Sequence, residues 1–208
     1  MTIIIILEDD DGFVIGADTG ELFYNRLIQK IDSKVIFQNI IVCTEDNQNI
    51  GDNILWVGLT GHGRIAEFIN HKFNPPKHQY DIDEWDYLYD YCKELKLQLD
   101  NYNLVIEKDN MSSTQSFLLI LYQGKVFYID DNFGITHNIE EYYCIGCAEE
   151  LALGSLYTTK DGSFNSEIRV KKALECCNYH DCYINDNFTI FKVGKNGKII
   201  KSIENQKV

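Results

Sequence analysis

Residue types that mark fibrous, disordered and membrane proteins are scarce in this sequence. Its 208 residues include only 2 Pro and 14 Gly, with no low-complexity tract and no internal repeat, which excludes a fibrous or disordered chain. No apolar run approaches the roughly 20 residues that cross a membrane. The run that follows Met1 is too short for a signal peptide and leads into acidic residues. A cytoplasmic globular protein is therefore expected.

Basic residues are also scarce. Lys and Arg total 19 against 32 Asp and Glu, so the formal net charge is −13. A field of that sign repels phosphate, which argues against nucleic acid and anionic membranes as partners. The seven Cys form an odd number in a chain without a signal peptide, and this indicates reduced thiols in the cytoplasm.

The chain does contain regular strand and helix patterns with no long linker between them. We therefore expect a single domain over residues 1–208. Residues 43–53 are polar and are expected to form a surface loop. Strands are expected at 2–7, 13–18, 34–42, 54–59, 117–122, 126–129, 144–146, 188–193 and 199–203.

Four segments have helical periodicity. A helix is expected to start near Gly61 and to be stopped by Pro75, and a second to contain the aromatic residues of the 80s. Two more are expected at 148–157 and 167–178. The candidate core positions of the last helix are Ile168, Val170, Leu174 and Cys177. Strands, two helices, strands, two helices and strands in this order predict an α+β fold, a four-layer αββα sandwich.

The first candidate for chemistry is Thr2, directly after Met1. Methionine aminopeptidases generally remove Met before a small residue, and this would give Thr2 a free α-amine beside its own hydroxyl. A Thr hydroxyl alone is a weak nucleophile, but an α-amine titrates near neutral pH and can accept its proton. The N-terminal-threonine pairing of nucleophile and base follows this principle.

Two further residues stand at regular spacing from Thr2. Sixteen positions separate it from Asp18, at the end of Val14-Ile15-Gly16-Ala17-Asp18, and sixteen more lead to Lys34. With Gly12, this pattern resembles the nucleophile, acid and lysine at the start of proteasome β-subunits and of their bacterial relative, the HslV peptidase. The resemblance implies the αββα fold of N-terminal-nucleophile (Ntn) hydrolases.

Later segments extend the resemblance over most of the chain. The turn at Gly61 resembles the one whose glycine amide helps to form the oxyanion hole. Cys147, before Ala152-Leu153-Gly154, stands in a segment that resembles a later turn beside the active site, and Asp181 in Asp181-Cys182-Tyr183 resembles a second aspartate near the threonine. Residues at about 43–53 and 75–111 match least and are interpreted as insertions of this protein.

The resemblance also implies a mechanism and partners. Asp18 would hold Lys34, whose ammonium would favour the Thr2 alkoxide and keep the α-amine neutral. The Gly61 amide would face the oxyanion, and Asp181 would orient the amine. The implied protein is a threonine endopeptidase that cleaves polypeptides inside a homo-oligomeric ring, with an ATP-dependent unfoldase as partner. No cofactor and no metal are expected.

Two departures from the family pattern leave alternatives open. Cys147 stands where a serine is usual, and Ile184 stands where a hydroxyl is usual. A thiol is a weaker hydrogen-bond partner, and an isoleucine side chain is none. These departures, or retention of Met1, would fit a non-catalytic scaffold or binding subunit. An Ntn amidase of small amides, its pocket reshaped by residues 75–111, is a third alternative.

Several other residues have two interpretations. A zinc site is conceivable from Cys144, Cys147, Cys176, Cys177 and His180, but we favour Cys144 and Cys147 as packed core thiols. Lys30 could take the role of Lys34, although the spacing from the hairpin expected for strands 2–7 and 13–18 favours Lys34. His62 could contact substrate or be an exposed turn residue. The aromatic helix of the 80s could face a partner, although most of its rings are expected in the core.

Overall fold

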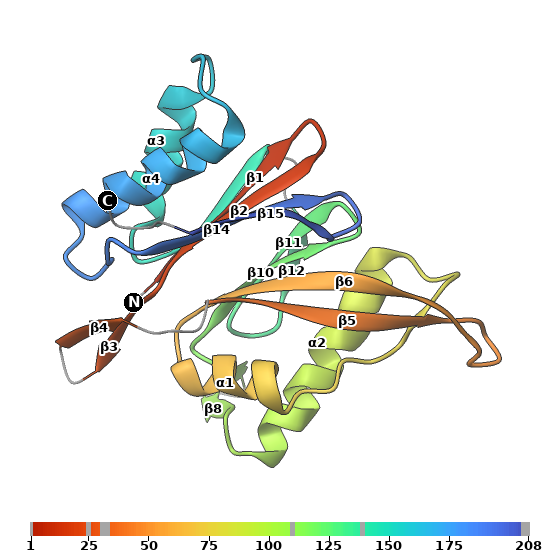
Figure 1. Cartoon of the computed structure of the whole chain (residues 1–208). Helices are drawn as coiled ribbons and strands as arrows, with labels where there is room; N and C mark the ends of the chain where they lie inside the picture. Colours follow the sequence, from red (N-terminus) through yellow and green to blue (C-terminus); the bar gives the residue numbers. More distant parts are fainter. Residues whose placement is uncertain (1, 24–25, 30–33, 109–110, 138–139, 205–208) are drawn as a thin grey trace. The chain divides into compact units, whose positions relative to one another are not determined.

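Two β-sheets organise the chain in this computed structural model, one in each of two compact units (Figure 1). The structure describes residues 2–23, 26–29, 34–108, 111–137 and 140–204. The first unit contains residues 1–35 and 139–208, and the second contains residues 36–138. That these units form a single domain stays a prediction, as does the interpretation of two segments as insertions.

The first unit is built on an antiparallel five-stranded sheet with the strand order β13-β1-β2-β14-β15. The N-terminal strand is therefore flanked on both sides, as its continuous apolar run predicts. A hairpin of β3 and β4 follows β2. The elements are β1 (Ile3–Asp9), β2 (Gly12–Asp18), β3 (Gly20–Phe23), β4 (Arg26–Gln29), β13 (Tyr142–Gly146), α3 (Glu149–Thr159), α4 (Ser166–His180), β14 (Phe188–Gly194) and β15 (Ile199–Glu204).

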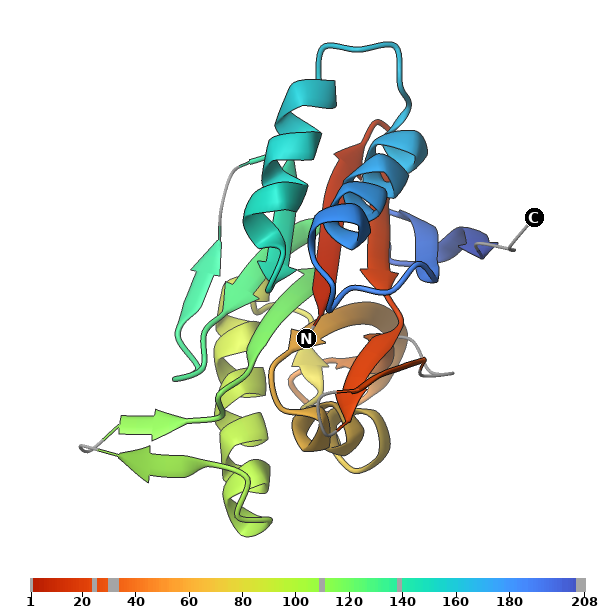
Figure 2. The ribbon, with the colours of Figure 1, turned by 90° about the vertical axis from the view of Figure 1, so that its left-hand side faces the viewer.

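Helices α3 and α4 lie side by side against this sheet (Figure 2). The close approach of α4 depends on Gly16 of β2, because a Cβ there would lie only 2.5 Å from Val170 Cγ1. Val170 and Leu174 are fully buried in a core of aliphatic residues, whereas Ile168 is exposed, so its predicted core position is wrong. On the face of the sheet that α3 and α4 cover, the packing is therefore made mainly by small and aliphatic side chains.

The second unit is built on a six-stranded sheet with the order β12-β11-β10-β6-β5-β7. Its short strand β7 runs parallel to β5, and β6, β10, β11 and β12 pair antiparallel in turn. The elements are β5 (Val35–Cys43), β6 (Asn49–Thr60), α1 (Gly63–His71), β7 (His78–Gln79), α2 (Glu84–Asn101), β8 (Ile106–Lys108), β9 (Met111–Ser113), β10 (Phe117–Tyr122), β11 (Lys125–Ile129) and β12 (Ile135–His137).

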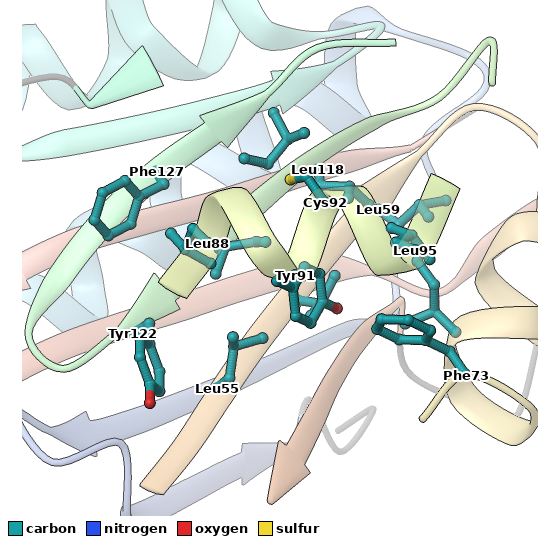
Figure 3. Packing of buried hydrophobic residues seen from close by; sticks show 14 of the residues in the cluster. Leu55, Leu59, Phe73, Leu88, Tyr91, Cys92, Leu95, Leu118, Tyr122 and Phe127 are labelled. Carbon is teal, nitrogen blue, oxygen red and sulfur yellow. The ribbon is translucent and has the colours of Figure 1, made fainter. Parts of the chain in front are cut away.

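Helix α2 supplies much of the core of the second unit. Leu88, Tyr91 and Leu95 share one buried cluster with Leu55 and Tyr122 of the sheet (Figure 3). The expectation that the aromatic helix mainly faces the core holds for Tyr87 and Tyr91, while Trp85 and Tyr89 are exposed. None of the described helices combines the length and the apolar sequence that a membrane span requires.

Two predicted boundaries are wrong. The polar stretch 43–53 is only partly a loop, because β6 already begins at Asn49. Helix α1 ends at His71 rather than at the prolines, because the N–H groups of Lys72 and Phe73 both bond to the Phe68 carbonyl and close the last turn. Polar edge residues continue a strand when a neighbouring strand pairs with their backbone, and hydrophobic periodicity does not report this pairing.

Candidate active site

Thr2 stands directly before β1, and its backbone is fixed by the turn that follows β13. The carbonyl oxygen of Thr2 accepts a 3.0 Å hydrogen bond from the Cys147 N–H. Gly146 lies opposite Ile3 with a φ of 128°, and a Cβ there would lie 1.9 Å from the Thr2 oxygen. Only glycine therefore lets this turn approach the start of β1 so closely.

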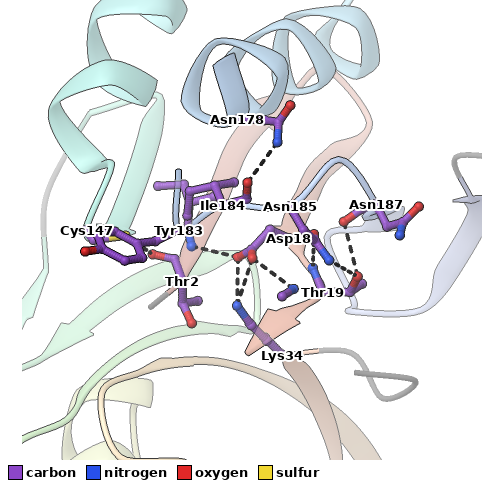
Figure 4. A network of polar contacts seen from close by, with 12 residues as sticks. Thr2, Asp18, Thr19, Lys34, Cys147, Asn178, Tyr183, Ile184, Asn185 and Asn187 are labelled. Atoms are coloured by element: carbon purple, nitrogen blue, oxygen red, sulfur yellow. Dashed lines mark hydrogen bonds and ion pairs between the residues drawn. The ribbon is translucent and has the colours of Figure 1, made fainter. Parts of the chain in front are cut away.

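Asp18 ends β2 next to the start of β1 and is completely buried. Its Oδ1 accepts the Ile3 N–H at 2.9 Å, and its Oδ2 accepts the Gly20 N–H at 3.0 Å. Lys34 Nζ lies 2.9 Å from each of the two oxygens (Figure 4). A buried carboxylate requires such compensation by charge-assisted bonds. The carboxylate that holds the Lys34 ammonium thus also binds the backbone N–H of Ile3, the residue that follows Thr2.

Cys147 is exposed, so the prediction that it packs in the core together with Cys144 is wrong for Cys147. Its Sγ lies 3.6 Å from the Thr2 oxygen, to which the thiol donates. Partial desolvation of the sulfur, followed by the neighbouring Asp181 carboxylate, raises the pKa of the thiol. A thiol with a raised pKa stays protonated at neutral pH and serves as a weak donor rather than as a nucleophile.

Asp181 follows α4 and lies close to Cys147. Its N–H bonds to the Cys177 carbonyl at 2.8 Å, and its Oδ1 accepts the Tyr183 N–H at 2.9 Å. Ile184 packs in the aliphatic core, and its carbonyl accepts a 2.8 Å bond from Asn178 Nδ2. At the position where a hydroxyl is usual, the side chain therefore points into the core, where it offers no polar group.

Two other cysteines of this unit, Cys144 and Cys177, are buried. Cys144 is buried, as predicted, and burial raises the pKa of its thiol. Burial also raises the pKa of Cys177 to about 12, and its Sγ donates to the Ala148 carbonyl at 3.5 Å. Within the described ranges no three His, Cys, Asp or Glu side chains converge as a metal site.

Two predicted residues lie in the second unit. Gly61 has a φ of 112°, and a Cβ there would lie 2.3 Å from the Gln115 carbonyl oxygen, so the turn after β6 requires glycine. His62 is exposed and caps α1 by accepting the Arg64 N–H. The oxyanion role of Gly61 stays a prediction, and Lys30, the competitor of Lys34, lies outside the described residues.

The structure thus links five of the six predicted site residues within the first unit. Asp18 binds Lys34 and the N–H of Ile3, the residue after Thr2. The Thr2 carbonyl accepts bonds from Cys147, and Asp181 lies close to the Cys147 thiol. Sequence reasoning missed Thr19 and Asn185, which bond to each other beside Asp18. Asn185, two residues after Asp181-Cys182-Tyr183, is visible in the sequence, but its partner Thr19 lies 166 positions away.

Comparisons with known proteins place the fold. No family model and no curated protein sequence matches the chain. Among solved structures, BPH of Thiobacillus denitrificans is 16% identical with a TM-score of 0.73, covering 95% of this chain and 100% of BPH. Anbu of Hyphomicrobium sp. strain MC1, a Gly-1 mutant, is 8% identical with a TM-score of 0.69, covering 98% of this chain and 87% of Anbu.

HslV of Trypanosoma brucei is also similar in structure. It is 14% identical with a TM-score of 0.58, and the match covers 90% of this chain and 97% of HslV. Identities this low carry a statement about fold and not about activity. They confirm the predicted α+β fold class: the chain shares the fold of BPH, Anbu and HslV.

Proposed function

We propose that this protein is an N-terminal threonine peptidase of the proteasome and HslV type, active after removal of Met1. One observation carries the proposal. The buried Asp18 carboxylate binds both the Ile3 N–H, next to Thr2, and the Lys34 ammonium. Replacing a buried ion pair by well-packed apolar residues often costs no stability, so stability alone is a weak reason for a fold to keep one. A buried pair next to a candidate nucleophile is therefore a candidate for a role in the reaction.

The proposed chemistry uses Thr2 alone as nucleophile and base. Its hydroxyl attacks the carbonyl carbon of a peptide bond, and the hydroxyl proton passes to the Thr2 α-amine. The Lys34 ammonium stabilises the alkoxide and lowers the proton affinity of the amine. The protonated amine then returns the proton to the leaving nitrogen, and water hydrolyses the ester. Gly61 is proposed to supply the oxyanion hole.

Cys147 and Asp181 are proposed to support the start of the chain. The Cys147 N–H and thiol both bond to the Thr2 carbonyl, which fixes the backbone that carries the nucleophile. Asp181, beside that thiol, is proposed to orient the α-amine. Because a thiol bonds more weakly than a serine hydroxyl, and the Ile184 side chain has no hydrogen-bonding group, we expect a lower rate than with both hydroxyls.

Two similar solved structures support the proposal, one through the compound bound to it and the other through its assembly. BPH of Thiobacillus denitrificans, with the same fold, is also known in complex with epoxomicin. Anbu of Pseudomonas aeruginosa forms a helical assembly. For this protein we propose a polypeptide substrate, a homo-oligomeric assembly that encloses the sites, and an ATP-dependent unfoldase as partner.

The test begins with the intact mass of the natively expressed protein and continues with fluorogenic peptides. We expect a mass lower by one methionine, peptide turnover, and an epoxomicin adduct on Thr2. Thr2→Ala should abolish turnover and adduct, while Thr2→Ser, which keeps a hydroxyl beside the amine, should retain both in part. Turnover by Thr2→Ala at the wild-type rate would refute the mechanism.

A non-catalytic scaffold is the second candidate, and the burial of Ile184 in the core favours it. Full-length mass with no processing, or Met1-free protein that neither turns over peptides nor reacts with epoxomicin, would support this candidate. Hydrolysis of small amides without any peptide hydrolysis would support the Ntn amidase alternative.

A further inference from the structure

Thr19, between Asp18 and Gly20, is held by the loop that joins α4 to β14. The Thr19 N–H donates to Asn185 Oδ1 at 3.2 Å and to the Asn187 carbonyl at 3.1 Å. The Thr19 hydroxyl donates to that same carbonyl at 3.3 Å and accepts a bond from Asn185 Nδ2 at 3.1 Å (Figure 4). We call these four bonds the Thr19 clamp. Thr19 and Asn185 are both buried, with 8% of each residue exposed.

The Thr19 clamp lies next to the groups that orient the Asp18 carboxylate. The N–H that binds Asp18 Oδ2 belongs to Gly20, in the peptide group that directly follows Thr19. Fixing the Thr19 backbone therefore fixes the donor to Oδ2, while the Ile3 N–H fixes Oδ1. The carboxylate, held in this plane, meets Lys34 Nζ with both oxygens at 2.9 Å.

We propose that Asn185 is a positioning residue for the Asp18–Lys34 pair, acting through Thr19. The inference rests on the proposed function, whose reaction uses the Lys34 ammonium. An Asn side chain has a donor and an acceptor, and Asn185 uses both on one residue. The Ile184 side chain points into the core and offers Thr19 no hydrogen bond, so the side chain that bonds to Thr19 is that of the next residue, Asn185.

Asn185→Ala should loosen Gly20 and let the carboxylate and Lys34 shift. We expect kcat to fall by roughly 10-fold to 100-fold with little change in KM, since small misplacements of reacting groups have effects of that size. A displaced ammonium would lower the amine pKa less. The amine would then stay protonated to higher pH, and the acidic limb of the pH profile of kcat/KM would move to higher pH.

Three variants separate positioning from a loss of loop stability. Asn178→Ala removes another Asn bond to the same loop, at the Ile184 carbonyl, without contacting Thr19. We expect it to lower the melting temperature but to leave the pH limb in place. Thr19→Val removes the hydroxyl from the clamp and should mimic Asn185→Ala. Thr19→Ser keeps the hydroxyl and should retain the wild-type pH profile. The double variant Asn185→Ala/Thr19→Val should lose less than the product of the two single losses.

Amide hydrogen exchange tests the clamp independently of turnover. We expect the Gly20 N–H to exchange faster in Asn185→Ala and at the wild-type rate in Asn178→Ala. If the Met1-free wild type is inactive but exchange changes in this way, the proposed function fails and the positioning of Asp18 stands. If the wild type is active and Asn185→Ala keeps either the wild-type exchange of Gly20 or the wild-type pH limb, Asn185 is only a loop anchor and the inference is wrong.

Discussion

The cores of the two units differ in kind. Beneath α3 and α4, the first unit packs mainly Ile, Leu, Val, Ala and Cys side chains, with the ring of Phe188 among them, and Gly16 lets α4 approach the sheet. The second unit packs aromatic rings, among them Phe68, Tyr91 and Tyr122. Small side chains permit close backbone approach, whereas rings fill a wider space between helix and sheet.

The buried polar groups differ in the same way. The first unit buries an ionised pair, Asp18 with Lys34. In the second unit, Tyr91 donates to Gln38 Oε1 at 2.9 Å, and His78 bonds through Nε2 to the Ile82 carbonyl and through Nδ1 to Tyr122. Such bonds satisfy polar groups that the fold has buried, whereas the buried ion pair also holds a charge that the proposed reaction would use. The comparison predicts that stability and activity can be perturbed separately in the two units.

Removal of the ammonium should have the largest effect. Lys34→Met should lower kcat about 1000-fold and lower the free energy of unfolding by about 3–5 kcal/mol, because Asp18 stays buried without its cation. Peptide turnover and urea unfolding measure the two losses. The double variant Asp18→Asn/Lys34→Met should recover stability but not activity. Recovery of both would show that the pair is purely structural.

A core cavity in the second unit should separate stability from turnover. Leu95 is buried on α2. Leu95→Ala should lower the free energy of unfolding by about 2–5 kcal/mol through lost burial and a cavity. The pH profile of the folded enzyme should not move. A shift of the acidic limb as large as that of Asn185→Ala would break the comparison between the units.

A hydroxyl at the position of the Cys147 thiol should have a smaller and opposite effect. Cys147→Ser supplies a stronger donor to the Thr2 carbonyl, which the thiol now reaches at 3.6 Å. We expect kcat to rise by about 2-fold to 10-fold, the size of one improved hydrogen bond. Cys147→Ala is the matched control and should be slower than wild type. Equal rates for all three would remove Cys147 from the site.

Two partly exposed carboxylates, one in each unit, should have the smallest effects on stability. Asp9 accepts bonds from Lys192 and Ser166, and Glu84 accepts one from Lys125. Burial is the largest single influence and acts to raise the pKa of both carboxyls, but the hydrogen bonds and the lysine charges together outweigh it, so both pKa values are lowered. Each carboxylate therefore stabilises the fold above its unfolded-state pKa, and this stability is lost as the pH falls through the lower folded-state pKa.

We expect Asp9→Asn to lower the free energy of unfolding at pH 7 by about 0.5–1 kcal/mol and Glu84→Gln by less, since Lys125 is half exposed. Urea unfolding at pH 7 and at pH 2 measures both. The differences from wild type should vanish at the lower pH. A difference that persists there would mean that packing, not charge, decides these sites.

Local patterns predicted most elements of the fold. The two strands around Gly12 follow from continuous apolar runs bounded by turn residues, and the helices α2, α3 and α4 follow from helical spacing. Both patterns depend on neighbours in sequence. The short strands β7, β8, β9 and β12 were missed, because two or three residues carry no measurable period. Ile168 and Cys147 were misplaced because their exposure depends on what another element covers.

The sequence by itself determined most strands of the two sheets, because their apolar patterns are local, and it singled out Thr2, Asp18 and Lys34 through their resemblance to a family pattern. Only the tertiary structure decided that Cys147 reaches the Thr2 carbonyl, that Ile184 points into the core, and that Asn185 clamps Thr19. These contacts join residues 145 to 166 positions apart. They exist because β1 and β2 lie between β13 and β14, and no local pattern contains that pairing.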